Sequence, residues 1–172
     1  GEVKIDRSSF IGVETSSQLK VDDDSYGFNL GAMFNLSPAT RIGIAYRSSV
    51  AYDLKGNVTV TGAGTAPILM EVKLPDTLAW SIAHQVNPKL ELLGDVTLTQ
   101  WSKIKRIPVV TTAASTLGPS GRVLDTFEFE FKDTYRIGIG ANYKLRNDFT
   151  LKLGVAYDKS PVSDQFRTVT LP

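Results

Sequence analysis

Residues 41–55 read RIGIAYRSSVAYDLK, and the two alternate rows of this stretch differ sharply in polarity. The even-numbered row contains Ile42, Ile44, Tyr46, Ser48, Val50, Tyr52 and Leu54, and the odd-numbered row contains Arg41, Gly43, Ala45, Arg47, Ser49, Ala51, Asp53 and Lys55. Successive side chains point to opposite faces of a β-strand, so one face is apolar and the other carries charges and very small residues. The pattern fits a half-buried sheet of a soluble protein, or a barrel wall with lipid outside and water inside.

The same alternation recurs along the chain, and no stretch has a helical period. We predict six strand segments, at residues 19–36, 41–55 (continuing to 60), 70–86, 90–99, 127–145 and 149–158. Pro75 interrupts the third segment, and because proline cannot donate to a β-ladder we expect a bulge or a strand edge there. The sequence therefore predicts an all-β fold, an antiparallel up-and-down meander of about six strands.

Connections between these segments alternate between short and long. Tight turns are expected at residues 37–40, 87–89 and 146–148, a looser stretch at 62–67 and a long loop at 111–125. All tight turns then fall at one end of the sheet, as in outer-membrane barrels. Several segments exceed the roughly 9–11 residues that cross a bilayer, whereas soluble strands average about five or six. Aromatic residues lie near the ends of the apolar rows, as interface girdles would: Tyr26, Phe34, Tyr52, Trp80, Phe127, Tyr143, Phe149 and Tyr157. We predict part of a transmembrane β-barrel, with a soluble all-β domain as the alternative.

The composition excludes several function classes. With 172 residues and a net charge of +1, nothing suggests a nucleic-acid partner. The absence of cysteine removes disulfides and thiolate chemistry. His84 lies on the apolar row without a serine–acid pattern, and residues 22–24 lack the spacing of a calcium loop. No glycine loop is placed to hold a phosphate. We therefore expect no catalytic residues, no metal and no cofactor.

Five short motifs, in order along the chain, resemble the FadL-type long-chain fatty acid transporters. They are residues 44–48 (IAYRS) with 53–56 (DLKG), 74–76 (LPD), 99–102 (TQWS), 131–138 (FKDTYRIG) and 157–162 (YDKSPV). The similarity covers residues 19–172. The resemblance implies a monomeric 14-stranded barrel in the outer membrane of a Gram-negative bacterium, plugged by an amino-terminal hatch. It also implies uptake of long-chain fatty acids or aromatic hydrocarbons.

The chain has too few strands for such a barrel and no recognisable hatch, so we interpret it as an internal segment of a family member. Residues 1–172 would form a single partial barrel domain, with 1–18 an extracellular loop or strand lead-in and 19–172 the barrel strands and loops. We expect passive transport of hydrophobic small molecules, with outer-membrane lipids around the wall. A general porin, a structural barrel and a soluble lipid-binding β-barrel are the alternatives.

Four residues are candidates for ligand binding. Arg47 and Arg136 share the row of small residues, which we assign to the lumen, and an arginine fork matches a carboxylate in two hydrogen bonds. Their alternative role is charge pairing with Asp53, Asp95, Glu128 or Glu130. Trp101 falls on the lumen row and could line a hydrophobic path, or be an interfacial tryptophan after a bulge. Arg167 follows the last family-like motif and is the fourth candidate.

Overall fold

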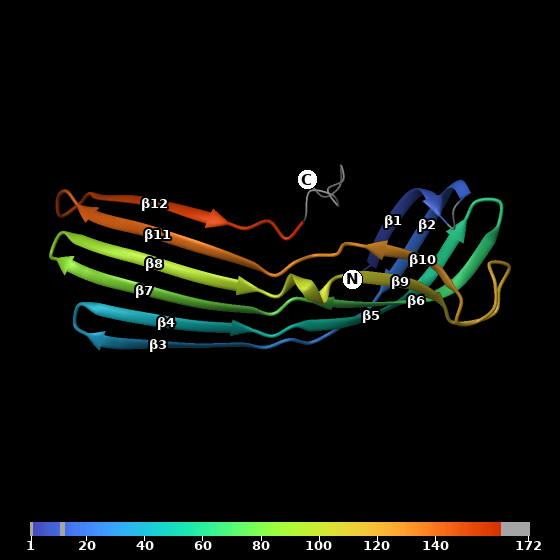
Figure 1. The fold of residues 1–172 in the computed structure, drawn as a ribbon, viewed down its shortest axis with the longest axis horizontal. Coiled ribbons are helices and arrows are strands. Elements are labelled where there is room, and N and C mark those ends of the chain that lie inside the picture. The colour runs from blue at the N-terminus through green and yellow to red at the C-terminus, as the bar shows by residue number, and fades with distance from the viewer. Residues whose placement is uncertain (1, 11–12, 163–172) are drawn as a thin grey trace. The chain divides into compact units, whose positions relative to one another are not determined.

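The computed structural model describes the backbone of residues 2–10 and 13–162. This part of the chain forms twelve β-strands and one short 3-10 helix, and every strand pairing is antiparallel, which confirms the all-β prediction. No helix in the described ranges is long and apolar enough to cross a membrane. The chain divides into two compact units, each built on one six-stranded sheet (Figure 1).

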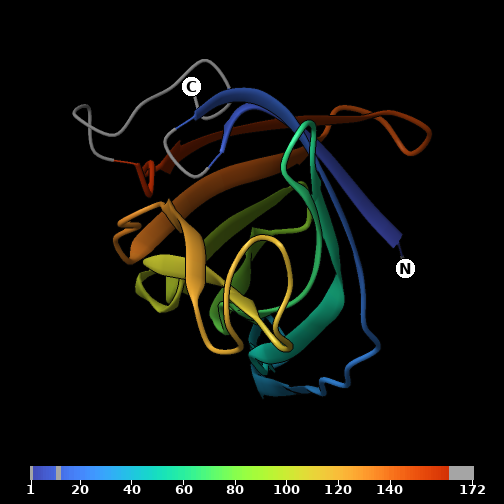
Figure 2. The same cartoon turned by 90° about the vertical axis from the view of Figure 1, so that its right-hand side faces the viewer.

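The first unit contains what we call the cored sheet, with strand order β1-β2-β5-β6-β9-β10. Its strands are β1 (Glu2–Phe10), β2 (Val13–Asp22), β5 (Val50–Val60), β6 (Gly64–Leu74), β9 (Arg106–Thr111) and β10 (Val123–Glu128). The strands curve strongly, as Figure 2 shows. Alternate residues on the inner face are buried, with Val58 and Val109 at 0% exposure and Ile68 at 1%. Every buried hydrophobic residue of the described chain belongs to this unit.

The second unit contains the open sheet, with strand order β12-β11-β8-β7-β4-β3 (Figure 1). Its strands are β3 (Asn29–Ser37), β4 (Thr40–Arg47), β7 (Thr77–Asn87), β8 (Leu90–Thr99), β11 (Thr134–Lys144) and β12 (Thr150–Asp158). The 3-10 helix η1 (Trp101–Lys103) follows β8. The strands run 8–11 residues, the length that a tilted strand needs to cross a bilayer.

Strand register keeps the two rows of the open sheet separate across all six strands. Ile44 lies opposite both Ala32 and Trp80, and Trp80 lies opposite Val96, which in turn faces Ile137. The apolar face formed in this way carries no Asp, Glu, Lys or Arg within the six described strands. Its side chains are exposed: Ile139 exposes 64%, Leu153 67% and Val155 70%. A row of this kind is stable only when something outside the chain removes it from water.

The three tight turns lie where the sequence predicts them, all at the same end of the open sheet (Figure 1). Side-chain acceptors stabilise two of them: Asn87 Oδ1 accepts from the N–H groups of Lys89 and Leu90 at 2.9 and 3.0 Å, and Ser37 Oγ accepts from Ala39 N–H at 3.2 Å. In the third, Phe149 N–H donates to Arg146 O at 3.3 Å. Asparagine and serine favour such turns because their short side chains bond the nearby backbone.

The prediction that each long segment is a single strand is wrong for four of the six segments. Segments 19–36, 41–60, 70–86 and 127–145 are each divided between one strand of the cored sheet and one of the open sheet. Pro75 lies in one of these breaks, as its missing N–H requires. Glu130, in another, has a φ of 45°, a region that non-glycine residues rarely adopt.

The predicted loop at 111–125 is shorter than expected, because Thr111 ends β9 and Val123 begins β10. Strand β9 is missing from the prediction. The Thr111 hydroxyl donates to Pro119 O at 2.6 Å and accepts from Arg122 N–H at 3.0 Å, which closes the loop at its base. Gly118 and Gly121 within it have φ values of 137° and 81°, which glycine adopts without strain.

Candidate functional site

The polar face of the open sheet is the candidate site, because it combines a smooth floor of small residues with a few ordered charges. The floor consists of Gly31, Gly43, Ala45, Ala79, Ser81, Ala83, Gly138, Gly140, Gly154 and Ala156. At Gly138 a Cβ atom would lie 2.5 Å from Asp95 Oδ1, so the glycine makes room for the carboxylate. Adjacent hollows on this face are lined by Gly43, Ser81, Met33 and Asp95.

Arg47 lies on this face at the end of β4, as predicted. Its Nε donates to Asn29 Oδ1 on the neighbouring strand at 3.1 Å. Among the described residues Arg47 forms no ion pair. Its side-chain partner is the neutral amide of Asn29, so no carboxylate compensates its positive charge. The remaining guanidinium donors suit a carboxylate in two parallel hydrogen bonds.

Arg136 shares the face but has a different partner. Its Nη1 donates to Asp95 Oδ2 on β8 at 2.9 Å, and the two side chains expose 47% and 40%. Asp95 is one of the charge-pairing partners that the sequence suggested as an alternative. The pair compensates the charge of Arg136, so an anionic ligand would gain less electrostatic attraction from this guanidinium than from an arginine without a carboxylate partner.

A third polar group lies toward the tight turns. Arg41 Nη2 donates to Glu91 Oε1 at 3.2 Å, and Asn142 Nδ2 donates to Glu91 Oε2 at 2.8 Å. The three residues come from β4, β8 and β11, so they extend across the middle of the sheet. Cross-strand pairs of this type fix the register of a polar face.

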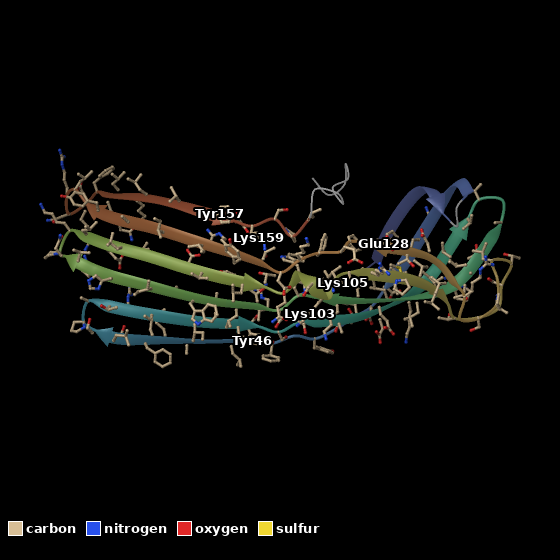
Figure 3. The ribbon with its side chains drawn as sticks, in the orientation of Figure 1. Tyr46, Lys103, Lys105, Glu128, Tyr157 and Lys159 are labelled. Carbon is tan, nitrogen blue, oxygen red and sulfur yellow. The ribbon has the colours of Figure 1, made fainter. Side chains whose placement is uncertain are left out.

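A cluster of polar side chains occupies the other end of the open sheet, opposite the tight turns. Asp76, which is 8% exposed, forms an ion pair with Lys103 and accepts from the Tyr46 hydroxyl at 3.4 Å. Figure 3 labels Tyr46 and Lys103 in this region. The hydrogen bond from Lys103 holds the pKa of Asp76 below its ordinary value. The backbone carbonyl of Asp76 also accepts from Gln100 N–H at 3.1 Å.

Trp101 and Asp133 extend this end cluster. Ser102 N–H donates to Asp133 Oδ1 at 2.9 Å, and hydrogen bonds from Ser102 lower the pKa of that carboxyl. Trp101 lies in η1, and its ring meets the Phe131 ring edge-on at 5.8 Å. Because β8 ends at Thr99, strand parity does not extend to Trp101, and contact of this residue with a ligand stays a prediction.

The structure brings Arg47 and Arg136 to one face of one sheet but places Trp101 in the end cluster. Arg167 lies outside the described residues. Asp76 and Asp133 were not among the residues predicted to bind a ligand. Their signal was nevertheless present, because the motifs at 74–76, 99–102 and 131–138 all contribute to this cluster.

A charge-free apolar face backed by a polar, small-residue face, with tight turns at one end, defines the wall of a transmembrane β-barrel. Comparison with known proteins identifies the family of barrels to which this wall belongs. Residues 7–172 match the family described as outer membrane protein transport protein (OMPP1/FadL/TodX), and the chain belongs to this family. It is therefore a segment of a barrel in the outer membrane of a Gram-negative bacterium.

Related proteins support the assignment. The chain is 28% identical over 163 residues to the long-chain fatty acid transport protein of Escherichia coli K12, covering 86% of this chain and 35% of that protein. It is 30% identical to outer membrane protein P1 of Haemophilus influenzae, covering 86% and 31%. The chain thus spans about a third of the length of these relatives.

Solved structures show the same fold. A FadL homologue of Pseudomonas aeruginosa matches with a TM-score of 0.75 at 22% identity, covering 90% of this chain and 39% of that protein. The toluene transporter TodX of Pseudomonas putida matches with a TM-score of 0.59 at 21% identity, covering 86% and 39%.

Proposed function

We propose that the protein to which this chain belongs carries hydrophobic small molecules, long-chain fatty acids or aromatic hydrocarbons, across the outer membrane. Family membership is the observation that carries this proposal. Relatives named for fatty acid transport and for toluene transport support both cargo classes. The open sheet would form part of the wall, with its polar face toward the lumen.

Arg47 is the residue we expect to distinguish these two cargo classes. A fatty acid ends in a carboxylate, whereas toluene carries no charge. The Arg47 guanidinium has only the Asn29 amide oxygen as a partner among the described residues, whereas Arg136 is neutralised by Asp95. A carboxylate would therefore gain more from Arg47. Trp101 and Arg167 remain secondary candidates for contact with the ligand.

The test is uptake by cells that lack their own transporter and express the complete protein. Arg47→Gln should reduce uptake of labelled oleate several-fold and leave uptake of toluene unchanged. Arg136→Gln is the matched control on the same face, and we expect it to have the smaller effect. Equal uptake of oleate by the wild type and by Arg47→Gln would show that Arg47 does not bind the fatty acid during transport. Failure of the wild type to carry either compound would refute the proposed function.

Movement would be passive and driven by the cargo gradient, and the complete barrel would act as a monomer. Liposomes that contain the purified protein should accumulate cargo only up to equilibrium and without an energy source. Accumulation beyond equilibrium would contradict passive transport. Entry of hydrophilic sugars at comparable rates would favour a general porin instead.

A further inference from the structure

The apolar face of the open sheet is not uniform, because one position in its centre has no side chain. Gly94 on β8 lies between Ile82 and Ile139 of the two neighbouring strands. The gap belongs to a groove of about 610 Å³ whose floor is Gly94. Its apolar rim is formed by Trp80, Ile82, Val96, Ile137 and Ile139.

The same face carries its first charge just beyond the end of β12. Lys159 N–H donates to Tyr135 O at 3.1 Å, so the two residues are cross-strand neighbours. The Lys159 ammonium lies 5.6 Å from the centre of the Tyr135 ring, and the Tyr135 and Tyr157 rings lie 6.0 Å apart. Figure 3 shows Tyr157 and Lys159 at the end of β12 that is opposite the tight turns.

Lys159 is exposed and forms no ion pair among the residues that the structure describes. The tyrosine ring occupies one side of the ammonium, so other N–H donors remain available to an anion. Asp158 follows the opposite, polar parity, and Asp133 is bound by Ser102. A phosphate that approaches along the apolar face would therefore meet a cation without a competing carboxylate.

The groove and the lysine are spaced to accommodate one lipid molecule. Tyr135 pairs with Leu98 on β8, and Gly94 lies four residues farther along the same strand. Four residues of antiparallel strand span about 13 Å along the strand, and β12 lies two strands, about 10 Å, to the side of β8. The hydrocarbon part of one leaflet is about 15 Å thick, half of the roughly 30 Å hydrocarbon core. A lipid with its phosphate at Lys159 can therefore lay an acyl chain across Gly94 within the same leaflet.

We propose that this face binds one lipopolysaccharide molecule, with a lipid A phosphate on Lys159 and an acyl chain in the Gly94 groove. Short turns face the periplasm in outer-membrane barrels, so the Lys159 end faces outward. The outer leaflet of this membrane is built from lipopolysaccharide, whose lipid A sugars carry phosphates. The proposal does not depend on which cargo the protein transports.

Native mass spectrometry of the complete, detergent-purified barrel tests the site, with lipid A, dephosphorylated lipid A and phosphatidylglycerol as probes. We expect the wild type to bind lipid A about fivefold more tightly than the dephosphorylated form, the effect of one cation near a lipid phosphate. Lys159→Gln should abolish this preference. Lys152→Gln, on the same strand but on the polar face, should leave it unchanged.

The groove is tested separately with Gly94→Val, which should weaken binding of all acylated probes. Ala141→Val is its control, because Ala141 lies on the same face but outside the groove. Should Gly94→Val fail to fold, Gly94→Ala replaces it, since its Cβ would meet only Ile82 Cγ2 at 3.2 Å and Gly138 O at 3.9 Å.

Three results would overturn the proposal. If Lys159→Gln and Lys152→Gln showed the same preference for lipid A over its dephosphorylated form, Lys159 would not be part of the binding site. If Gly94→Val and Ala141→Val bound the acylated probes equally well, the Gly94 groove would not be the binding site of the acyl chain. Binding of phosphatidylglycerol as tight as that of lipid A would show that the site takes any phosphate-bearing lipid, contrary to the assignment to lipopolysaccharide.

Discussion

The cored sheet and the open sheet have the same alternating pattern, yet their apolar rows have opposite environments. In the cored sheet Val58 and Ile68 are almost completely buried by protein. In the equivalent row of the open sheet, Ile139 and Leu153 expose 64% and 67% of their side chains. The buried residues of the open-sheet unit are instead polar, namely Ser48, Asp76 and Thr134. One sheet thus supplies its own apolar environment, and the other takes it from the bilayer.

The same substitution in both sheets tests this contrast most strongly. Ile68→Ala removes a side chain that is 1% exposed and leaves a cavity that rigid neighbours cannot fill, so we expect a loss of about 2–5 kcal/mol. Ile139 faces lipid tails, which can fill the space that a smaller side chain leaves. Ile139→Ala should therefore lower the free energy of unfolding by no more than about 2 kcal/mol. Urea titration of the complete barrel in bilayers measures both. Equal losses would contradict the assignment of different environments.

A charge on the apolar face of the open sheet should have the next largest effect. Leu153→Lys places an ammonium in the hydrocarbon layer and should cost about 2–4 kcal/mol if the residue lies near the bilayer midplane. Ala156→Lys on the same strand points to the polar face and is the control. The measurement is the fraction of protein that reaches the folded, heat-modifiable form in the outer membrane. Normal assembly of Leu153→Lys would refute the lipid-facing assignment.

The end cluster of the open sheet should make a smaller contribution to the free energy of unfolding, and this contribution should depend on pH. Asp76→Asn removes the charged partner of Lys103, and hydrogen bonds to charged groups contribute about 1.5–3 kcal/mol. Because the pKa of Asp76 is lower in the folded state, its stabilisation is complete above the ordinary value of 3.8 and is lost as the pH falls below it. Unfolding measured from pH 7 to pH 3 should show this loss in the wild type and a weaker one in Asp76→Asn. Identical pH profiles would exclude Asp76 from the effect.

The smallest effect is expected on the polar face, where water screens the charges. Arg136→Gln should destabilise the barrel by about 0.2–1 kcal/mol, because both partners of its ion pair are about half exposed. The double variant with Asp95→Asn should cost no more than the single one, since the two residues contribute through one interaction. A loss of several kcal/mol would show that this face is dry, as in the cored sheet.

Periodicity predicted strand type, tight turns and the shared face of Arg47 and Arg136, but it could not locate the breaks between the sheets. The even row that begins at Ile42 continues without a change of parity through Ser48 into Val58, although the first is on the open sheet and the last in a protein core. Alternation reports that one face is apolar and not whether lipid or protein covers it. The breaks depend on contacts distant in sequence, such as Phe28 N–H donating to Ser48 Oγ at 2.9 Å.

The closed base of the loop at residues 112–122 has a practical consequence. Thr111 bonds Pro119 and Arg122 in the second half of this loop, and Leu117 is buried in the core, so the exposed residues Ala113 and Ala114 are the ones that can change with least effect on the register of β9 and β10. A fluorophore introduced at Ala114, which is exposed and lies outside the contacts at the base of the loop, would label the protein while sparing both the lipid-facing row and the polar face.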